Sequence, residues 1–286
     1  MMNKILIYAL FIITFILTIS IYGLLISIFP RRHVTEIKPS DIGLKYEDVT
    51  LTTSDNIKLK AWFIPNNKTK NAIIVCHGYP FDKGNVLGFA PFLHKNYNLL
   101  FFDFRAMGQS EGKYTTIGYK ETEDLKAAVQ YLKDKNIKNT GAIGFSLGAA
   151  TILMAQSKDI KAIVADSPYA NLNLMINALY RQFFFLKYPF TALTKILAKL
   201  IMGIDTSNIS PEKAIKDIEA PILLIHGEKD TQIKVENSYL LKKANPEAEL
   251  WIVKNADHGQ AHNIKKEEYE TKVLNFFNKH LNKTIK

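Results

Sequence analysis

A serine between two glycines, at the end of a short apolar segment, constrains this chain more than any other feature. The run Ala142-Ile143-Gly144-Phe145-Ser146-Leu147-Gly148 contains the pattern Gly-x-Ser-x-Gly. A serine on a sharp turn from a strand into a helix must take a strained backbone conformation, and glycines on both sides let neighbouring chains pass closely. The pattern therefore predicts a strand, a tight turn that carries Ser146, and a helix.

The residues on either side of this turn agree with that order. Asn139 to Phe145 is short and apolar, as expected for a buried strand, and Leu147 to Ala155 is rich in Leu, Ala, Ile and Met without a helix breaker. Strand, turn and helix are the context that a nucleophile elbow requires. The alternative interpretation is a glycine-rich strand end whose serine has no chemical role.

The N-terminal segment predicts a membrane anchor. Ile5 to Phe29 contains no charged residue, and at ~1.5 Å per residue a helix of this length crosses a hydrocarbon core of ~30 Å. A cleaved signal peptide is the alternative, but its apolar region would be shorter and would end at a small-x-small site. The only weak match, Thr18-Ile19-Ser20, is followed by further apolar residues. We therefore expect residues 1–30 to form a single-pass, uncleaved anchor.

Charge and cysteine content limit the binding partners and the kinds of site that this chain can have. Lys4 precedes the apolar segment and Arg31, Arg32 and Lys38 follow it, so the positive-inside tendency favours a cytoplasmic catalytic domain. The net charge of +10 is compatible with an anionic membrane surface. The lysines are scattered and form no recognisable nucleic-acid module, so no nucleic-acid partner is expected. Cys76 is the single cysteine, which excludes an intramolecular disulfide and a cysteine metal cluster.

Short apolar strands alternate with amphipathic helices through residues 31–286. This alternation predicts an α/β fold with a mostly parallel sheet and helices on both faces, and places ligands at the carboxyl ends of the strands. A hairpin is expected over Tyr46 to Thr52 and Ile57 to Ile64, because both segments alternate apolar and polar residues. Further strands are expected over 72–76, 99–104, 160–165, 222–225 and 250–253, and further helices over 88–94, 119–135 and about 265–280.

From this hairpin onward the chain resembles the α/β hydrolases. His77-Gly78 resembles their oxyanion loop, Gly144 to Gly148 their elbow, and Asp103-Phe104-Arg105-Ala106-Met107-Gly108-Gln109-Ser110 their Asp-x-Arg-Gly-x-Gly-x-Ser signature. Ala106 replaces the usual first glycine, so that turn is expected to be slightly altered. Within this family, the chain resembles the membrane-anchored BEM46-type hydrolases. The resemblance implies the α/β-hydrolase fold, a helical lid inserted at about 169–215, and no metal or organic cofactor.

The partners of Ser146 are sought in the order serine, acid, base. His258 lies just beyond the last expected strand, in Asn255-Ala256-Asp257-His258-Gly259, and is the predicted base; His262 is the alternative. Asp230 follows the strand at 222–225 and resembles the acid of the family. Glu228 and Asp257 are the alternative acids, although Asp257 adjoins the histidine and neighbouring side chains in an extended loop usually point apart.

These assignments predict a serine hydrolase. His258 accepts the Ser146 proton, Asp230 orients the imidazole, and the backbone N–H groups of Tyr79 and Leu147 stabilise the oxyanion. The expected substrates are small-molecule or lipid acyl esters, with thioesters as a variant. Related dehalogenases and epoxide hydrolases carry aspartate at the elbow, so those reactions are excluded. A serine peptidase of the same fold and a catalytically inactive scaffold are the alternatives.

The expected lid is rich in large apolar residues, among them Phe183-Phe184-Phe185-Leu186 and Tyr188. Such a segment lines an apolar acyl site or contacts the bilayer. The alternative is that these residues only pack the lid onto the sheet.

Overall fold

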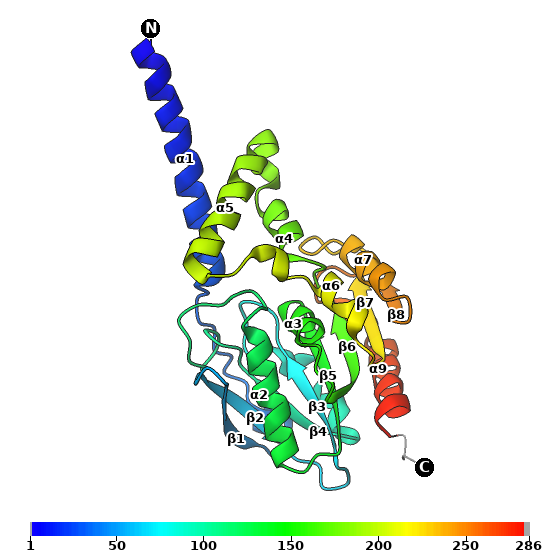
Figure 1. The fold of residues 1–286 in the computed structure, drawn as a ribbon. Helices are drawn as coiled ribbons and strands as arrows, with labels where there is room; N and C mark the ends of the chain where they lie inside the picture. The colour runs from blue at the N-terminus through cyan, green and yellow to red at the C-terminus, as the bar shows by residue number, and fades with distance from the viewer. Residues whose placement is uncertain (1, 283–286) are drawn as a thin grey trace.

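The computed structural model describes residues 2–282, in which helices cover both faces of an eight-stranded sheet (Figure 1). The strand order is β1-β2-β4-β3-β5-β6-β7-β8. This arrangement is the α/β-hydrolase fold, as the sequence predicted. The strands are β1 (Glu47–Thr52), β2 (Lys58–Ile64), β3 (Asn71–Cys76), β4 (Asn98–Phe102), β5 (Asn139–Phe145), β6 (Ile160–Asp166), β7 (Ile222–Gly227) and β8 (Glu249–Val253).

The sheet is antiparallel at one edge and parallel elsewhere. The predicted hairpin pairs β1 with β2, and β2 continues antiparallel to β4. From β4 to β8 every neighbouring pair is parallel. The carboxyl ends of β3, β5, β7 and β8 therefore meet at one edge of the sheet, where the loops that follow them carry the predicted site residues.

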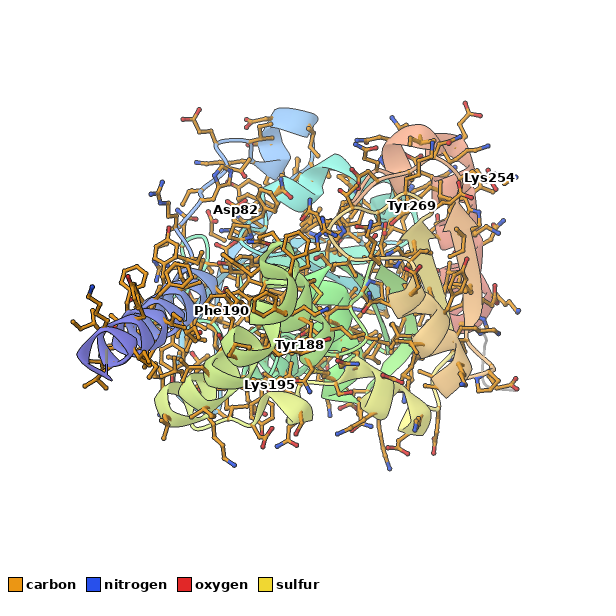
Figure 2. The ribbon with its side chains drawn as sticks, turned by 90° about the horizontal axis from the view of Figure 1, so that it is seen from above. Asp82, Tyr188, Phe190, Lys195, Lys254 and Tyr269 are labelled. Carbon is orange, nitrogen blue, oxygen red and sulfur yellow. The ribbon has the colours of Figure 1, made fainter. Side chains whose placement is uncertain are left out.

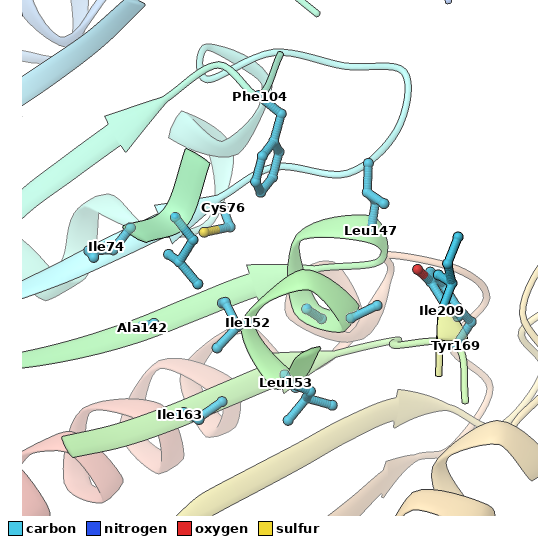
Figure 3. Packing of buried hydrophobic residues seen from close by; sticks show 14 of the residues in the cluster. Ile74, Cys76, Phe104, Ala142, Leu147, Ile152, Leu153, Ile163, Tyr169 and Ile209 are labelled. Atoms are coloured by element: carbon cyan, nitrogen blue, oxygen red, sulfur yellow. The ribbon is translucent and has the colours of Figure 1, made fainter. Parts of the chain in front are cut away.

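Two layers of helices bury the sheet. The helices α2 (Glu121–Asp134), α3 (Leu147–Ala155) and α7 (Glu236–Ala244) pack on one face, where the side chains of α3 lie over β5 and β6 (Figure 3). The opposite face is covered by α9 (Lys266–Leu281) and two 3₁₀ turns. Because both faces are covered, the central strands are continuous apolar runs rather than alternating ones. Helix α7 was not predicted from the sequence.

The helix expected over residues 88–94 is wrong. The structure has two separate 3₁₀ turns there, η2 (Asn85–Gly88) and η3 (Pro91–Lys95). Pro91 opens the second turn, and a proline lacks the N–H that a continuous helix would need. The strand expected over residues 99–104 also ends earlier, at Phe102, because the signature motif begins a turn there.

The insertion between β6 and β7 forms the expected helical lid. Its first helix begins at Leu172, where the Asn171 side chain caps the helix by accepting from the Leu174 N–H at 3.0 Å. Its longest helix ends at Met202 and is capped by Gly203, whose φ of 70° suits glycine. The elements are α4 (Leu172–Leu179), η4 (Arg181–Leu186), α5 (Lys187–Met202), η5 (Thr206–Asn208), α6 (Pro211–Ala214) and η6 (Ile215–Asp217).

The N-terminal helix α1 (Met2–Ile28) has two different halves. Lys4–Ile28 is long and apolar enough to cross a membrane, and its first half is exposed and projects from the molecule (Figure 1). The second half packs onto the hydrolase fold: Leu24 and Ile28 are buried, and the Thr115 N–H donates to the Ile28 carbonyl at 2.9 Å. Beyond α1, the Arg32 guanidinium donates to the carbonyls of Gly108, Ser110 and Gly112. The C-terminal half of α1 and the residues just after it therefore contact the hydrolase fold directly.

Candidate active site

Ser146 lies on the predicted sharp turn, between β5 and α3. Its φ of 52° and ψ of −114° are strained for a residue with a side chain. A Cβ on Gly144 would lie 2.5 Å from the Ala149 nitrogen, and one on Gly148 would lie 2.5 Å from the Cys76 carbonyl oxygen. Both glycines are therefore required by close backbone approach. The Ser146 N–H donates to the Asp166 carbonyl at 2.8 Å, which fixes the turn to β6.

The structure brings Ser146, His258 and Asp230 into one hydrogen-bonded row. His258 Nδ1 lies 2.7 Å from Asp230 Oδ2, and His258 Nε2 lies 3.1 Å from Ser146 Oγ. A carboxylate only accepts, so Nδ1 carries the proton and Nε2 is left to accept from the serine hydroxyl. Ser146 and Asp230 are buried, and the Phe145 ring lies 4.8 Å from the imidazole, centroid to centroid. The arrangement can take a proton from the serine.

Asp230 is held as a carboxylate by the groups around it. Burial alone would raise its pKa, but contacts with His226 and His258 and the Ile233 N–H outweigh burial and lower it. The Ile233 N–H donates to Asp230 Oδ1 at 2.7 Å, and the Gln232 N–H donates to the same oxygen at 2.9 Å. These bonds leave Oδ2 facing the imidazole. A charged acceptor there stabilises the imidazolium that forms when Ser146 loses its proton.

The alternative site residues lie elsewhere. Asp257 Oδ1 accepts from the backbone N–H groups of His258 and Thr231, both at 2.7 Å, so it ties the acid loop to the base loop instead of facing the imidazole. These two bonds lower the pKa of Asp257. Glu228 is exposed and accepts from the Asn255 N–H at 3.2 Å. His262 Nε2 lies 3.1 Å from Glu270 Oε1.

His226 holds the acid loop in place and does not face Ser146. It is fully buried, and its Nε2 lies 2.7 Å from the Ile233 carbonyl oxygen and 3.4 Å from Asp230 Oδ2. Because a carbonyl only accepts, Nε2 carries the proton, and Nδ1 accepts from Ser238 Oγ at 2.6 Å. The imidazole therefore braces the acid loop against α7.

His77 fixes the loop that resembles an oxyanion loop. The buried imidazole donates from Nδ1 to the Gly78 carbonyl at 2.8 Å, and its Nε2 accepts from the Phe104 N–H at 3.0 Å. An accepting Nε2 requires a neutral ring, and burial lowers the pKa of His77. The ring therefore links this loop to the turn after β4, next to Tyr79. Sequence reasoning assigned the loop but not this link.

We expect His77 to make stability depend on pH. Its ordinary pKa is 6.5, so below that value the unfolded chain takes up a proton that the folded chain excludes. The free energy of unfolding should therefore fall as pH drops below 6.5, by up to ~1.4 kcal/mol per pH unit. Chemical denaturation of the wild type and His77→Gln in detergent, from neutral to mildly acidic pH, measures this slope. The variant should lack that component, and identical slopes would contradict a neutral buried His77.

The signature motif forms a tight turn in which Ala106 stands at a positive φ. This residue has a φ of 61°, a conformation that favours glycine, and its N–H donates to the Glu111 carbonyl at 2.8 Å. Asp103 is buried against Lys83, with Nζ and Oδ2 at 2.8 Å, and also accepts from the Lys83 and Gln109 N–H groups. A Cβ on Gly108 would lie 2.4 Å from the Asp103 carboxyl. The motif is therefore a scaffold for the loop beside the site.

A cavity of about 260 Å³ opens beside Ser146 and His258. This volume is slightly below the ~300–1,000 Å³ found for ligand pockets, which suits a single slender group. Tyr79 and Leu147 line the cavity next to the serine. Leu147 is the first residue of α3, so its backbone N–H has no acceptor within the helix. Within residues 2–282, no cluster of three or more His, Cys, Asp or Glu side chains is placed to hold a metal ion.

The far walls of the cavity come from the lid and from α1. Gly23, Leu24, Ser27 and Ile28 of α1 line it, and the Tyr79 hydroxyl donates to the Ile26 carbonyl at 3.0 Å. Sequence reasoning missed this role of α1; the small residues within an apolar helix were the only local signal. The lid contributes Leu172, Met175, Ile176, Leu179, Thr194, Ala198, Met202 and Thr206.

Comparison with known proteins gives consistent matches. The model of the prolyl oligopeptidase family matches residues 92–284, which include Ser146, Asp230 and His258. The crystal structure of the Pyrococcus furiosus esterase Pf2001 is 35% identical, covers 89% of this chain and 98% of that chain, and has a TM-score of 0.72. Bacillus subtilis YqkD is 32% identical over 76% of this chain and 74% of its own length. The Saccharomyces cerevisiae membrane protein YNL320W is 31% identical over 45% of each chain.

Proposed function

Because the chain belongs to the prolyl oligopeptidase family and has the α/β-hydrolase fold, we propose that it is a serine hydrolase that cleaves carboxylic esters. The observation that carries this proposal is the hydrogen-bonded row of Ser146, His258 and Asp230 at the mouth of an apolar cavity. The similar Pyrococcus furiosus protein is an esterase.

In the proposed reaction, Ser146 Oγ attacks the carbonyl carbon of the ester while His258 Nε2 takes the hydroxyl proton. Asp230 holds the imidazole in the required tautomer and stabilises its cation. The protonated imidazole then gives its proton to the leaving alcohol, and an acyl-enzyme remains on Ser146. A water molecule, deprotonated by the same imidazole, releases the acid and restores the serine.

The developing oxyanion needs donors that are in place before the reaction. We assign this role to the backbone N–H groups of Leu147, directly after the nucleophile, and Tyr79, in the loop that His77 fixes. Each such donor is worth ~3 kcal/mol of transition-state stabilisation in known cases. The positive end of the α3 dipole adds to the same field.

A serine peptidase is the second candidate, favoured by the name of the matching family. The cavity is lined mainly by Leu, Ile, Met and Tyr side chains, which suit an acyl chain better than a hydrated peptide backbone. Purified full-length chain should therefore hydrolyse p-nitrophenyl esters and leave prolyl p-nitroanilide peptides intact. Preferential cleavage of the peptides would replace the ester proposal with the peptidase.

We expect the acyl chain length of the substrate to affect turnover. Each methylene buried in the cavity contributes ~0.8 kcal/mol, so kcat/KM for p-nitrophenyl hexanoate should exceed that for the acetate by at least about tenfold. Met175→Trp would fill the cavity, and this variant should lose the preference while still cleaving the acetate. A flat or reversed preference in the wild type would remove the acyl-binding role of the cavity.

The proposal includes the topology of the chain. Helix α1 is a single-pass anchor, residues 31–286 form the hydrolase domain, and residues 169–215 form its lid. The excess of Lys and Arg just after α1 favours a cytoplasmic domain. A catalytically inactive scaffold is the non-enzymatic alternative, and the tautomer imposed on His258 by Asp230 argues against it.

A further inference from the structure

The lid hairpin, formed by α4, η4 and α5 (residues 172–202), lies alongside the apolar helix α1 (Figure 1). The Phe15 and Phe190 rings are 5.9 Å apart, centroid to centroid, and Ser20 Oγ donates to the Phe190 carbonyl at 3.4 Å. In Figure 2, Phe190 of α5 lies closer to α1 than Tyr188 does. The hairpin is therefore fixed to α1 by direct contacts.

The position of these contacts along α1 sets the depth of the hairpin. At ~1.5 Å per residue, Phe15 lies ~15 Å along the helix from Ile5 and ~20 Å from Ile28. Phe15 is therefore near the middle of the segment that crosses the bilayer under the proposed topology. A side chain that packs on Phe15 lies at a similar depth, so the tip of the hairpin cannot stay in water while α1 spans the membrane.

The composition of the hairpin fits this environment. The tip of the hairpin is apolar: Phe184 is 81% exposed and Phe185 is 76% exposed. Tyr188, Ile196 and Leu200 extend the exposed apolar surface along α5. Exposure of such a patch to water is unfavourable, whereas in a bilayer its side chains contact the lipid acyl chains.

The charges of the hairpin are all of one sign. Between Ser167 and Ile204 the chain has no Asp or Glu, and its charged residues are Arg181, Lys187, Lys195 and Lys199. Basic side chains with apolar neighbours are typical of helices that lie at membrane interfaces, where they reach anionic headgroups. The positive charge of the hairpin and its exposed apolar side chains therefore both indicate binding to a bilayer that contains anionic lipid.

The cavity beside Ser146 is walled by α1 and the hairpin together. We propose that the hairpin is embedded in the same leaflet as α1 and that the enzyme takes its ester directly from the bilayer, one acyl chain of a membrane lipid entering the cavity between these elements. The substrate class is a membrane lipid carboxylic ester. The embedding rests on the proposed anchor, and the substrate class rests on the proposed esterase activity.

The depth of the hairpin can be measured without any substrate. Cys76 is the only cysteine and is fully buried, so a new surface cysteine carries the only reactive thiol. Phe184→Cys and, independently, Phe185→Cys are labelled with an environment-sensitive fluorophore and placed in phosphatidylcholine and phosphatidylglycerol vesicles. Phe11→Cys, on the exposed half of α1, is the membrane reference, and Gln130→Cys, exposed on α2, is the aqueous reference.

We expect nitroxides on the lipid acyl chains to remove most of the fluorescence at residues 184 and 185, as at residue 11, and little at residue 130. Quenching by aqueous iodide should follow the opposite order. Fluorophores at 184 and 185 that only iodide quenches would overturn the embedding. Fluorophores shielded from both quenchers would also overturn it, because they would show that a second copy of the protein covers the tip.

Access of the lipid substrate from the bilayer is tested by placing acidic residues at the tip of the lid hairpin. The double variant Phe184→Glu/Phe185→Glu should hydrolyse a diacylglycerol ester in vesicles at least about tenfold more slowly than the wild type, because acidic residues resist burial in lipid. Its rate on soluble p-nitrophenyl acetate should stay within about twofold, since neither phenylalanine lines the cavity. Tyr239→Glu, an exposed aromatic residue on α7, is the matched control and should change neither rate.

Different results would contradict lateral access from the bilayer and the underlying esterase activity. If the wild type cleaves soluble ester but the double variant cleaves lipid ester at the wild-type rate, lateral access from the bilayer is wrong. If the wild type cleaves no ester and does not react with a fluorophosphonate, the esterase proposal is wrong and the substrate class falls with it. In either case, the quenching of the fluorophores at residues 184 and 185 still tests whether the hairpin is embedded in the bilayer.

Discussion

Replacing Ser146 with alanine is expected to lower kcat for p-nitrophenyl butyrate by about four to six orders of magnitude, the range found when a triad nucleophile is removed. The variant should fold normally, because alanine adds no atom to the strained turn. Initial rates of full-length protein in detergent, with matched amounts of wild type and variant, measure the effect. The remaining rate should reflect only oxyanion stabilisation and substrate binding.

Ser167→Ala is the matched control for this loss. Ser167 is also buried with a positive φ, of 53°, but its Oγ donates to Asp166 Oδ1 at 2.9 Å instead of facing His258. We expect this variant to retain ester hydrolysis within about tenfold of the wild type. A Ser146→Ala enzyme with near wild-type turnover would contradict the assignment of the nucleophile.

Replacing His258 with alanine should be nearly as damaging, with kcat lowered by about four to six orders of magnitude. Without the imidazole, nothing accepts the serine proton, and the negative charge of Asp230 has no cation to stabilise. The loss should appear in kcat far more than in KM, because the imidazole acts on the reacting atoms rather than on substrate binding. Steady-state kinetics over a range of ester concentrations separate the two.

His262→Ala is the control for the base. His262 lies four residues from His258 and pairs with Glu270, so its loss should leave kcat within about tenfold of the wild type and act mainly through stability. A larger loss of kcat in His262→Ala than in His258→Ala would transfer the role of base to His262.

The elements around the serine were predictable because their signals are local. Asn139–Phe145 and Leu147–Ala155 have the predicted bounds, since a buried parallel strand and a helix without breakers are each visible within one short window. The proximity of Asp230 and His258 was inferred differently. Each follows a strand in an order known from a resembled family, and the parallel sheet brings the two loops together.

What the sequence did not indicate depends on contacts between distant segments. The role of α1 in the cavity wall arises because Gly23 lets the helix approach Tyr180, where a Cβ would lie 2.5 Å from the phenolic oxygen. The hydrogen bond from the Thr231 N–H to the Asp257 carboxylate joins residues 26 positions apart. The periodicity of apolar residues along the sequence does not indicate contacts between residues so far apart. The helix expected at 88–94 was wrong for a local reason: it was inferred from its place between two strands, and Pro91 interrupts a continuous helix there.

The most direct test of the account is to find the residue that a fluorophosphonate modifies. The wild type, Ser146→Ala and His258→Ala are treated with the probe, and intact-mass and peptide mass spectrometry locate any adduct. We predict one adduct per wild-type chain, on Ser146, no adduct on Ser146→Ala, and strongly slowed labelling of His258→Ala. An adduct on another residue, or equal labelling of the wild type and Ser146→Ala, would contradict the proposal that Ser146 is the attacking atom.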